Sequence, residues 1–406
     1  MKILFITQYF HPEPYFLGLP FAKELVRRGH SVEILTGFPC YPQGKLYDGY
    51  KIKFIYREII EGIPVIRLPL YPSHDRSFLR RMMYYSTLSL SLSAIGPWIA
   101  KKADVAFVSQ GPATLGLPAM IFKWFRRVPF VYNIQDMWPD AVANFGCNKP
   151  AIWLLDRFCR YFYRSADRVV AQSPGIQREL CRRGVSSDKI EFIYNWCDET
   201  QIKPASYDPA LAEKMKMKGK FNILHAGAMG KVQGLSSVID AANILKDKRP
   251  EIQFVFIGGG IERKNLEKKA TDLQLKNVIF HDRVPPSEIG KIMALADVML
   301  VHITDTFLHS IAIPSKIQAY LAVGKPIMAG VRGDAADLVI KANAGLQCQP
   351  ENSEAIAATS EQFYNTPKDS LRQMGENAAI FYKSHLSLSI AAQKYVQVFE
   401  QFKRKS

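Results

Sequence analysis

Glycines and lysines that follow a buried strand give this sequence its clearest chemical signal. The twelve residues from Ile223 to Gly234, ILHAGAMGKVQG, form a turn poor in side chains that contains Gly227, Gly230 and Lys231. Such a turn exposes backbone N–H groups beside a helix N-terminus, which favours an anion, and a lysine adds charge for a diphosphate. An ordinary strand-to-helix connection would also need these glycines, so the stretch alone leaves both interpretations open.

Two further turns in the second half have the same character. Glycines 258–260, with Gly259 at their centre, follow the apolar run IQFVFI, and Pro314-Ser315-Lys316 begin an apolar helical stretch. Glycines and helix N-termini recur at one edge of a parallel sheet when anionic ligands bind there. The second half is therefore expected to hold a negatively charged, nucleotide-like ligand.

In the first half, the candidates for chemistry are Asp136 and Gly18. Asp136 follows the strand PFVYNI and would lie at its carboxyl end, where a catalytic or acceptor-binding carboxylate is useful. A carboxylate there could equally cap the next helix. Gly18 is the glycine of the first strand-to-helix turn, where it could let a ligand approach the backbone or simply adopt a loop conformation. This turn lacks the GxGxxG pattern of dinucleotide sites.

Strands and helices alternate along the whole chain, which predicts an α/β fold with two doubly wound, Rossmann-like domains facing a cleft. A chain of 406 residues is too long for one ordinary core. The polar stretch 200–220 indicates a linker. We therefore expect an N-terminal domain over 1–200, a second domain over 201–385, and an amphipathic C-terminal helix, 386–406, that packs on the first domain.

The net charge of +16 suits an anionic membrane surface, phosphate-bearing substrates or nucleic acid. No recognisable nucleic-acid module accompanies the charge, which disfavours nucleic acid as the partner. A predicted helix over 151–168 carries Arg157, Arg160, Arg164 and Arg168 on one face. The same half contains further cations and aromatic residues at Arg76, Phe78, Arg80, Arg81, Tyr84, Tyr85, Lys123, Trp124, Phe125, Arg126 and Arg127. These residues could lie on anionic lipid, and a solvated basic face would explain them equally.

Targeting and redox signals are weak. The chain starts with a predicted strand of the fold, MKILFI, and shows no signal peptide. The apolar stretch 82–100 contains several serines and Gly96-Pro97, so a buried or surface helix is favoured over a membrane span. The six cysteines (Cys40, Cys147, Cys159, Cys181, Cys197 and Cys348) lack zinc spacing, which favours reduced thiols in the cytosol.

The chain as a whole resembles the retaining nucleotide-sugar glycosyltransferases of family 4, which have the GT-B fold. It looks most similar to a bacterial surface-polysaccharide branch that includes the N-acetyl-L-fucosamine transferases. Seven segments in the same order carry the resemblance: QYFHPEP, ELVRRGHSVEILTGFPCYPQGKLYDGY, NIQDMWPDAV, YNWCDE, HAGAMGKVQGL, FIGGG and IPSKIQAYLAVGKPIMA.

The resemblance implies a UDP-sugar donor, transfer with retention of configuration, no metal at the site and no cofactor. By the family pattern, residues 227–231 hold the diphosphate. Lys231 and Lys316 would stabilise the charge that develops on the β-phosphate, and Asp136 is the third catalytic candidate. Arg283, Val284 and Pro285 line the base, while Pro314, Ser315 and Lys316 lie near the donor sugar and phosphates. Gly18 and Asp136 face the donor sugar and acceptor, and Asn195 lies at the domain junction.

The sequence departs from the family at two places. The family's paired glutamates, with seven residues between them, fall on Ile311 and Ala319. The Arg and Lys of its diphosphate turn fall on Ala228 and Gln233, which leaves Lys231 as the cation there. These departures put the individual donor contacts in doubt.

The leading hypothesis is a transferase that moves a sugar such as N-acetyl-L-fucosamine from UDP to a polyprenyl-diphosphate-linked oligosaccharide. It would act in O-antigen, capsule or lipopolysaccharide biosynthesis as a peripheral protein on the inner face of the cytoplasmic membrane. Two alternatives stay open. The chain could be a soluble epimerase or phosphorylase of the same fold, or an inactive scaffold that lacks the family's glutamates.

Overall fold

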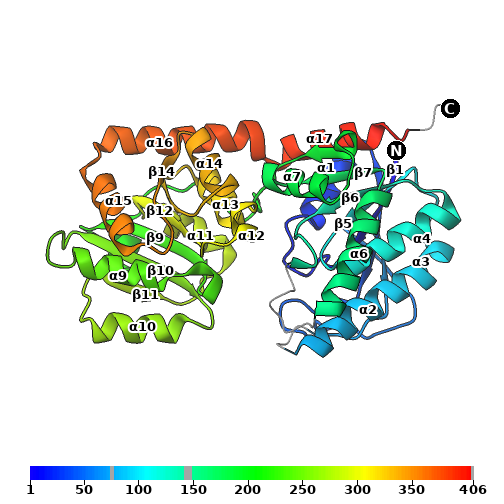
Figure 1. Cartoon of the computed structure of the whole chain (residues 1–406), viewed down its shortest axis with the longest axis horizontal. Helices are drawn as coiled ribbons and strands as arrows, with labels where there is room; N and C mark the ends of the chain where they lie inside the picture. The colour runs from blue at the N-terminus through cyan, green and yellow to red at the C-terminus, as the bar shows by residue number, and fades with distance from the viewer. Residues whose placement is uncertain (74–76, 141–148, 404–406) are drawn as a thin grey trace. The chain divides into compact units, whose positions relative to one another are not determined.

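The computed structural model describes residues 1–73, 77–140 and 149–403, which form two compact units (Figure 1). One unit contains residues 1–194 and 391–406, and the other contains residues 195–390. Arg76 and Cys147 lie outside the described residues, as does the side chain of Phe78. The five cysteines within the described residues are free thiols.

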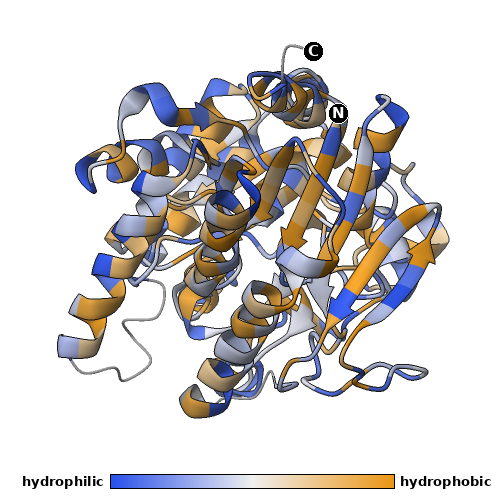
Figure 2. Cartoon of the chain, turned by 90° about the vertical axis from the view of Figure 1, so that its right-hand side faces the viewer, coloured by the Kyte–Doolittle hydropathy of each residue, from blue (hydrophilic) through white to orange (hydrophobic). Residues whose placement is uncertain are grey.

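The first unit is built on an eight-stranded sheet in the order β3-β4-β2-β1-β5-β6-β7-β8. Its strands are β1 (Lys2–Thr7), β2 (Ser31–Gly37), β3 (Tyr56–Ile60), β4 (Ile63–Leu68), β5 (Val105–Ser109), β6 (Phe130–Ile134), β7 (Arg168–Ala171) and β8 (Ile190–Phe192). The pairings are parallel except between β3 and β4. The central strands are apolar along their length (Figure 2), as expected where helices cover both faces of a parallel sheet.

Helices cover both faces of this sheet. Helices α2 (Phe78–Ala94), α3 (Gly96–Ile99), α4 (Gly116–Arg126) and α6 (Lys149–Ser165) lie side by side on one of them. Helices α1 (Leu19–Arg27) and α7 (Pro174–Arg182) and the C-terminal helix α17 (Leu388–Glu400) lie on the other. Tyr395 of α17 packs its ring 5.1 Å from that of Phe21 and 5.2 Å from that of Phe107. Most of α17 therefore belongs to the core of the first unit.

The second unit has an all-parallel six-stranded sheet in the order β11-β10-β9-β12-β13-β14. Its strands are β9 (Phe221–Ala228), β10 (Ile252–Gly259), β11 (Val278–His281), β12 (Val298–His302), β13 (Ile327–Gly330) and β14 (Gly345–Gln347). The helices are α8 (Pro209–Lys214), α9 (Ser236–Leu245), α10 (Arg263–Asp272), α11 (Pro286–Met293), α12 (Phe307–Ser310), α13 (Ser315–Val323), α14 (Asp334–Lys341), α15 (Ser353–Asn365) and α16 (Lys368–Phe381).

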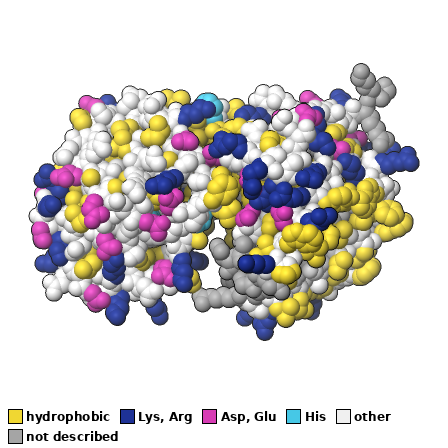
Figure 3. Space-filling model, viewed as in Figure 1, with side chains coloured by type: hydrophobic (Ala, Val, Ile, Leu, Met, Phe, Trp, Pro, Cys, Tyr) yellow, Lys and Arg dark blue, Asp and Glu magenta, His cyan; other side chains and the backbone are white. Residues whose placement is uncertain are grey.

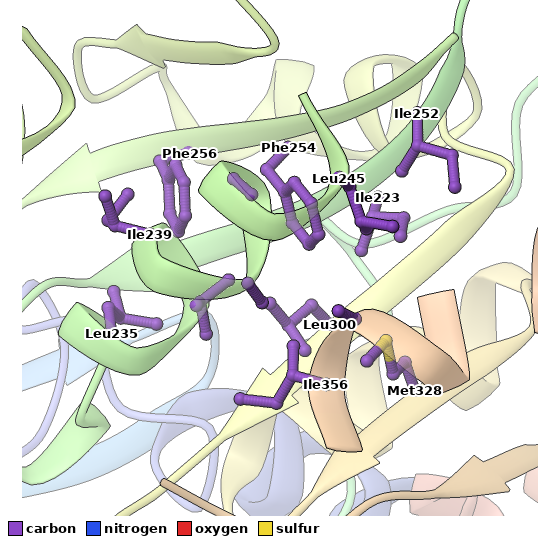
Figure 4. Close-up of a cluster of buried hydrophobic side chains, with 14 of the residues drawn as sticks. Ile223, Leu235, Ile239, Leu245, Ile252, Phe254, Phe256, Leu300, Met328 and Ile356 are labelled. Carbon is purple, nitrogen blue, oxygen red and sulfur yellow. The ribbon is translucent and has the colours of Figure 1, made fainter. Parts of the chain in front are cut away.

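One hydrophobic cluster fixes this sheet against its helices. Phe254 and Phe256 of β10 face Ile239 of α9, and Ile356 of α15 closes the cluster near Leu300 of β12 (Figure 4). These side chains are almost fully buried. Because strand and helix are anchored on the same core, the turn that joins β9 to α9 is held at the carboxyl edge of the sheet.

The doubly wound α/β organisation expected from the sequence is confirmed, with three local differences. The expected 151–168 helix ends at Ser165, and Arg168 lies in β7, so assigning Arg168 to the helix face was wrong. The apolar stretch 82–100 is divided where Pro97 lies in the first turn of α3. The antiparallel strand β3 was not expected, because its alternating exposure leaves no apolar run.

Candidate functional site

Glycines let two strand ends come close together at the carboxyl edge of the second sheet. Gly227 of β9 and Gly258 of β10 are paired, with φ values of +129° and +132°. A Cβ atom on Gly258 would lie 2.1 Å from the carbonyl oxygen of Gly227. Glycine is therefore required at 258 both for its backbone conformation and for its space.

A lysine of the second unit lies close to Gly227. Lys316, in the first turn of α13, places its Cε 2.9 Å from the position that a Cβ on Gly227 would take. Its Nζ lies 2.8 Å from Nε2 of His225, a residue buried in β9. Tyr320, one turn along α13, accepts from the amide N–H of Ala226 at 3.1 Å. Helix α13 is thus fixed to β9 through the side chains of Lys316 and Tyr320.

The charge of Lys316 has no anionic partner among the residues that the structure describes. Burial lowers the pKa of Lys316 to about 7, and burial beside Lys316 lowers the pKa of His225 well below its usual value. A neutral imidazole brings no negative charge to the lysine, and Nε2 of His225 also lies 3.1 Å from the carbonyl oxygen of Ala228. A phosphate oxygen bound at Gly227 would supply the negative charge that Lys316 lacks.

The turn after β9 is organised by Gln233. Its Oε1 accepts from the N–H of Gly230 at 2.9 Å, and its carbonyl oxygen lies 2.7 Å from Nδ1 of the buried His302. Lys231, in the same turn, is exposed and has no ion pair with a described residue. Gln233, which stands where the family has a lysine, therefore closes the turn. The N–H of Gly230, one of the backbone donors expected to bind the diphosphate, is already hydrogen-bonded to Gln233.

The expected base-binding residues lie beyond β11. Arg283 is exposed, and its Nε lies 3.4 Å from where a Cβ on Gly259 would be, so its side chain passes over the end of β10. Val284 is half-buried, and Pro285 precedes α11 as its N-cap. This arrangement places Arg283 and Gly259 together at the same edge of the sheet as Gly227.

The positions of the family's two glutamates are apolar and buried. Ile311 is 7% exposed and Ala319 is 6% exposed. Pro314 is the N-cap of α13 and Ser315 is exposed at its first position. The N-terminus of this nine-residue helix therefore carries Lys316 but no carboxylate at either family position.

The first unit contains a cavity of about 340 Å³ at the carboxyl edge of its own sheet. It is lined by Gln8, Tyr9, Tyr15, Arg81, Tyr85, Ser109, Gln110, Gly111, Gln135, Asp136 and Trp138. Asp136 is exposed to solvent on one side, yet burial by its other neighbours raises its pKa. A carboxylate with a raised pKa beside a polar cavity suits proton transfer or the binding of a hydroxyl group.

Two glutamines of this cavity were not singled out from the sequence. The Nε2 of Gln8 and the Oε1 of Gln110 are buried without a hydrogen-bond partner among the described residues. Gly111 leaves room for Gln8, because a Cβ there would lie 2.0 Å from the Gln8 Oε1. Buried polar atoms are costly unless a ligand or water binds them, so both side chains are suited to hold a polar acceptor.

The first strand-to-helix loop shapes one wall of this cavity through Glu13. Its carboxylate accepts from the N–H groups of Phe10, Cys40 and Tyr41 at 2.9–3.0 Å, and burial raises its pKa to about 7. Tyr9 packs against Tyr41 with ring centroids 4.5 Å apart. The loop and the segment after β2 are therefore held together.

Gly18 is not among the residues that line the cavity. Its N–H donates to the carbonyl oxygen of Tyr15 at 2.9 Å, and a Cβ would come within 3.0 Å of that oxygen. Tyr15 itself lines the cavity and contacts the Ser109 hydroxyl at 2.6 Å. Gly18 therefore acts on the cavity through the turn that positions Tyr15, and direct contact with the donor stays a prediction.

Arg183 positions the segment that follows Asp136. The buried guanidinium donates to the carbonyl oxygen of Trp138 at 2.6 Å and forms ion pairs with Asp140 and with the buried Glu179. No pattern in the sequence indicates this role, because only the fold brings Arg183 beside Trp138. Among the described residues, no cluster of three or more His, Cys, Asp or Glu side chains forms a metal site.

The expected residues thus fall into two groups. Gly227, Gly230, Lys231, Gly259, Arg283, Val284, Pro285, Pro314, Ser315 and Lys316 belong to the second unit, and Gly18 and Asp136 belong to the first. Within the second unit, a Cβ on Gly227 would lie 2.9 Å from Lys316, and a Cβ on Gly259 would lie 3.4 Å from Arg283. Asn195 is the first residue of the second unit.

Comparison with known sequences connects both units to carbohydrate chemistry. Residues 19–196 match the glycosyl transferase 4-like domain, and residues 209–381 match the glycosyl transferases group 1 family. The chain is 27% identical to WcaI of Escherichia coli strain K12, assigned as a colanic acid biosynthesis glycosyl transferase, over 91% of this chain and 93% of WcaI. It is 25% identical to WbjE of Pseudomonas aeruginosa, assigned as a glycosyltransferase, over 67% and 69% of the two chains.

Solved structures share the fold over the whole chain. HepE of Anabaena, solved with UDP and glucose, has a TM-score of 0.71 at 19% identity and covers 98% of this chain and 99% of its own. Sucrose-phosphate synthase of Thermosynechococcus elongatus has a TM-score of 0.73 at 17% identity, with complete coverage of both chains. These likenesses establish the two-domain fold and no more.

Proposed function

This chain belongs to the glycosyltransferases with the GT-B fold, and we propose that it transfers a sugar from UDP to a polyprenyl-diphosphate-linked oligosaccharide with retention of configuration. The observation that carries the proposal is the uncompensated ammonium of Lys316 at Gly227. It supports a diphosphate site at the carboxyl edge of the second sheet. The neighbour solved with UDP and glucose and the relative assigned to colanic acid biosynthesis support the same class of donor and product.

In the proposed reaction, the acceptor hydroxyl oxygen bonds to the anomeric carbon as the bond from that carbon to the UDP β-phosphate oxygen breaks. Attack from the face that UDP leaves retains configuration without a protein nucleophile, and the hydroxyl proton passes to the Asp136 carboxylate. Negative charge develops on that phosphate, where Lys316, Lys231 and the N-terminus of α13 stabilise it. These groups would take the place of a metal ion.

The acceptor is proposed to bind in the cavity of the first unit. Asp136 would accept a hydrogen bond from the attacking hydroxyl, and Gln8 and Gln110 would bind neighbouring hydroxyl or amide groups. Gly18 is proposed to face the donor sugar, Arg283 to Pro285 to line the base, and Pro314 and Ser315 to flank the sugar and phosphates. N-acetyl-L-fucosamine is our proposed sugar, and O-antigen or capsule assembly on the inner face of the cytoplasmic membrane is the proposed setting.

A second candidate follows from the buried Ile311 and Ala319. These positions supply no carboxylate for the ribose or the donor sugar, which is also what an inactive scaffold would show. A soluble epimerase is less well supported, because such an enzyme needs more acidic and histidine groups than those that line the cavity.

The test is a transfer assay with a panel of UDP-N-acetylhexosamines and a polyprenyl-diphosphate-linked acceptor, with and without a chelator. We expect release of UDP, a product whose anomeric configuration by NMR matches that of the donor, and no loss of activity on chelation. A product of inverted configuration contradicts the mechanism. UDP binding without transfer to any acceptor, or release of a free epimerised sugar, supports one of the two alternatives.

A further inference from the structure

The first unit exposes large apolar side chains on one layer of helices. We define the outer aromatic face as Leu79 and Leu90 of α2, Trp98 of α3, Trp124 and Phe125 of α4, and Trp153, Leu154 and Phe158 of α6. Trp98 is 80% exposed, Phe125 is 70% exposed and Trp153 is 61% exposed. Hydrophobic side chains gather over these helices with Lys and Arg among them (Figure 3).

Helical spacing places the exposed apolar residues of α2 and of α6 on one side of each helix. On α2, the exposed residues Leu79, Met83, Ser86 and Leu90 recur every three to four positions, which places them on one side of the helix. Trp153, Leu154 and Phe158 repeat the pattern on α6. Scattered apolar residues are ordinary on protein surfaces, whereas large contiguous apolar patches mark an interaction site.

The charge on these four helices is strongly one-sided. Their sequences contain eight Lys or Arg residues and one acidic residue, Asp156, which pairs with Arg160 at 2.5 Å. Asp167, just beyond α6, pairs with Lys123 at 2.8 Å. Arg126 and Arg164 donate to backbone carbonyls of neighbouring segments, which leaves their charge in place. Arg157 lies over the ring of Trp153 at 5.2 Å. Aromatic residues among cations are typical of proteins that lie at a lipid headgroup layer.

We propose that the outer aromatic face docks on an anionic lipid bilayer. Its aromatic side chains would enter the headgroup region, while the arginines and lysines would contact lipid phosphates. A second copy of the chain fits less well, because two such faces would bring like charges together. No helix of the described residues is long and apolar enough to cross a membrane, so this contact would lie on the surface of the bilayer.

The outer aromatic face also bears on the proposed function. Its role in catalysis rests on the proposal that the acceptor is lipid-linked. Helix α2 supplies Arg81 and Tyr85 to the wall of the cavity that contains Asp136. The same helix presents Leu79 and Met83 to solvent. Docking through α2 would therefore bring the cavity to the level of the headgroups, where the diphosphate of a polyprenyl-linked substrate lies.

The test is sedimentation of the full chain with vesicles of phosphatidylcholine, with and without phosphatidylglycerol. We expect binding to the anionic vesicles that weakens as salt is raised. The double variant Trp98→Ser/Phe125→Ser should bind at least about tenfold more weakly. The matched control is Ile380→Ser on α16 of the other unit, because Ile380 is 64% exposed and lies outside the face. Circular dichroism checks that the variants fold.

Equal binding to neutral vesicles, equal binding by the double variant, or no binding at low salt would overturn the proposal. A dimer seen by sedimentation velocity and lost in the double variant would also overturn it, in favour of an interface between copies. The assay needs neither donor nor acceptor. Failure here with intact UDP binding therefore rejects the docking surface alone, whereas vesicle binding without UDP binding rejects the proposed function alone.

Discussion

The Nζ of Lys316 lies 2.8 Å from Nε2 of His225, although the two residues are 91 positions apart in the sequence. Because burial lowers the pKa of His225 well below its usual value, the imidazole is neutral and brings no charge that would offset that of Lys316. The Cε of Lys316 lies 2.9 Å from the position that a Cβ on Gly227 would take. The end of β9 is therefore preorganised for an anion before any ligand arrives.

Binding of UDP should take up a proton near neutral pH. Burial lowers the pKa of Lys316 to about 7, and a diphosphate beside it would raise that pKa, because the anion favours the charged form. Above about pH 7 the affinity for UDP should thus fall as pH rises. Calorimetric titrations in buffers of different ionisation enthalpy, at about pH 8, measure the uptake. Uptake that persists unchanged in Lys316→Met would show that another group titrates.

A side chain at Gly227 should weaken both stability and UDP binding. In Gly227→Ala, the backbone φ of +129° is strained and the new Cβ would lie 2.9 Å from Cε of Lys316. We expect a loss of about 1–3 kcal/mol in the free energy of unfolding and a weaker affinity for UDP.

The control is Gly219→Ala, which has a φ of +75° but nothing within 4 Å of its Cβ position. It should lose stability and keep its affinity for UDP. Calorimetry and urea unfolding separate the two effects. Unchanged UDP binding in a folded Gly227→Ala variant would argue against close approach of the diphosphate to this turn.

Removal of the Asp136 charge should strongly slow transfer and leave donor binding intact. Asp136→Asn is expected to lower kcat by roughly 10²–10⁴-fold, with UDP affinity unchanged, since Asp136 and Lys316 belong to different units. Burial raises the pKa of Asp136, so wild-type activity should fall as pH decreases through that raised pKa. The pH profile of kcat/KM measures this loss of activity on its acidic limb. A variant that keeps both wild-type turnover and the acidic limb would exclude Asp136 from the reaction.

Arg183 should matter more for stability than its exposed neighbour Arg182. In Arg183→Met, Glu179 loses a partner in a buried site, and a broken buried ion pair costs about 3–5 kcal/mol. Arg182 also pairs with Glu179, but its side chain is 69% exposed, so Arg182→Met should cost less than about 1 kcal/mol. Thermal unfolding of both variants provides the comparison. Similar losses would show that the fold does not depend on the buried pair.

The sequence predicts the fold class well because parallel strands buried on both faces are continuous apolar runs, as in β1, β5 and β9. The hairpin strand β3 does not stand out, because its residues alternate between exposed and half-buried positions. The end of α6 is misjudged for a different reason. Arg164 and Arg168 have helical spacing, yet Ala166 and Asp167 already lead into β7, and spacing does not reveal where tertiary pairing takes over.

The candidate site is only partly visible in the sequence. Glycines and lysines in strand-to-helix turns are a local signal, so Gly227, Lys231 and Lys316 stand out. His225, Gln110 and Arg183 do not, because each acquires its role from a partner distant in the chain. The direct donor contacts and the catalytic role of Asp136 stay predictions, since they depend on a ligand.

The most direct measurement is calorimetric titration of UDP into the wild-type chain and into Lys316→Met and Lys231→Ala. We expect micromolar binding by the wild type, a loss of at least about tenfold, or 1.4 kcal/mol, in Lys316→Met, and a smaller loss in Lys231→Ala, whose side chain is exposed. No UDP binding by the folded wild type, or full affinity in both variants, would contradict a donor site at the carboxyl edge of the second sheet.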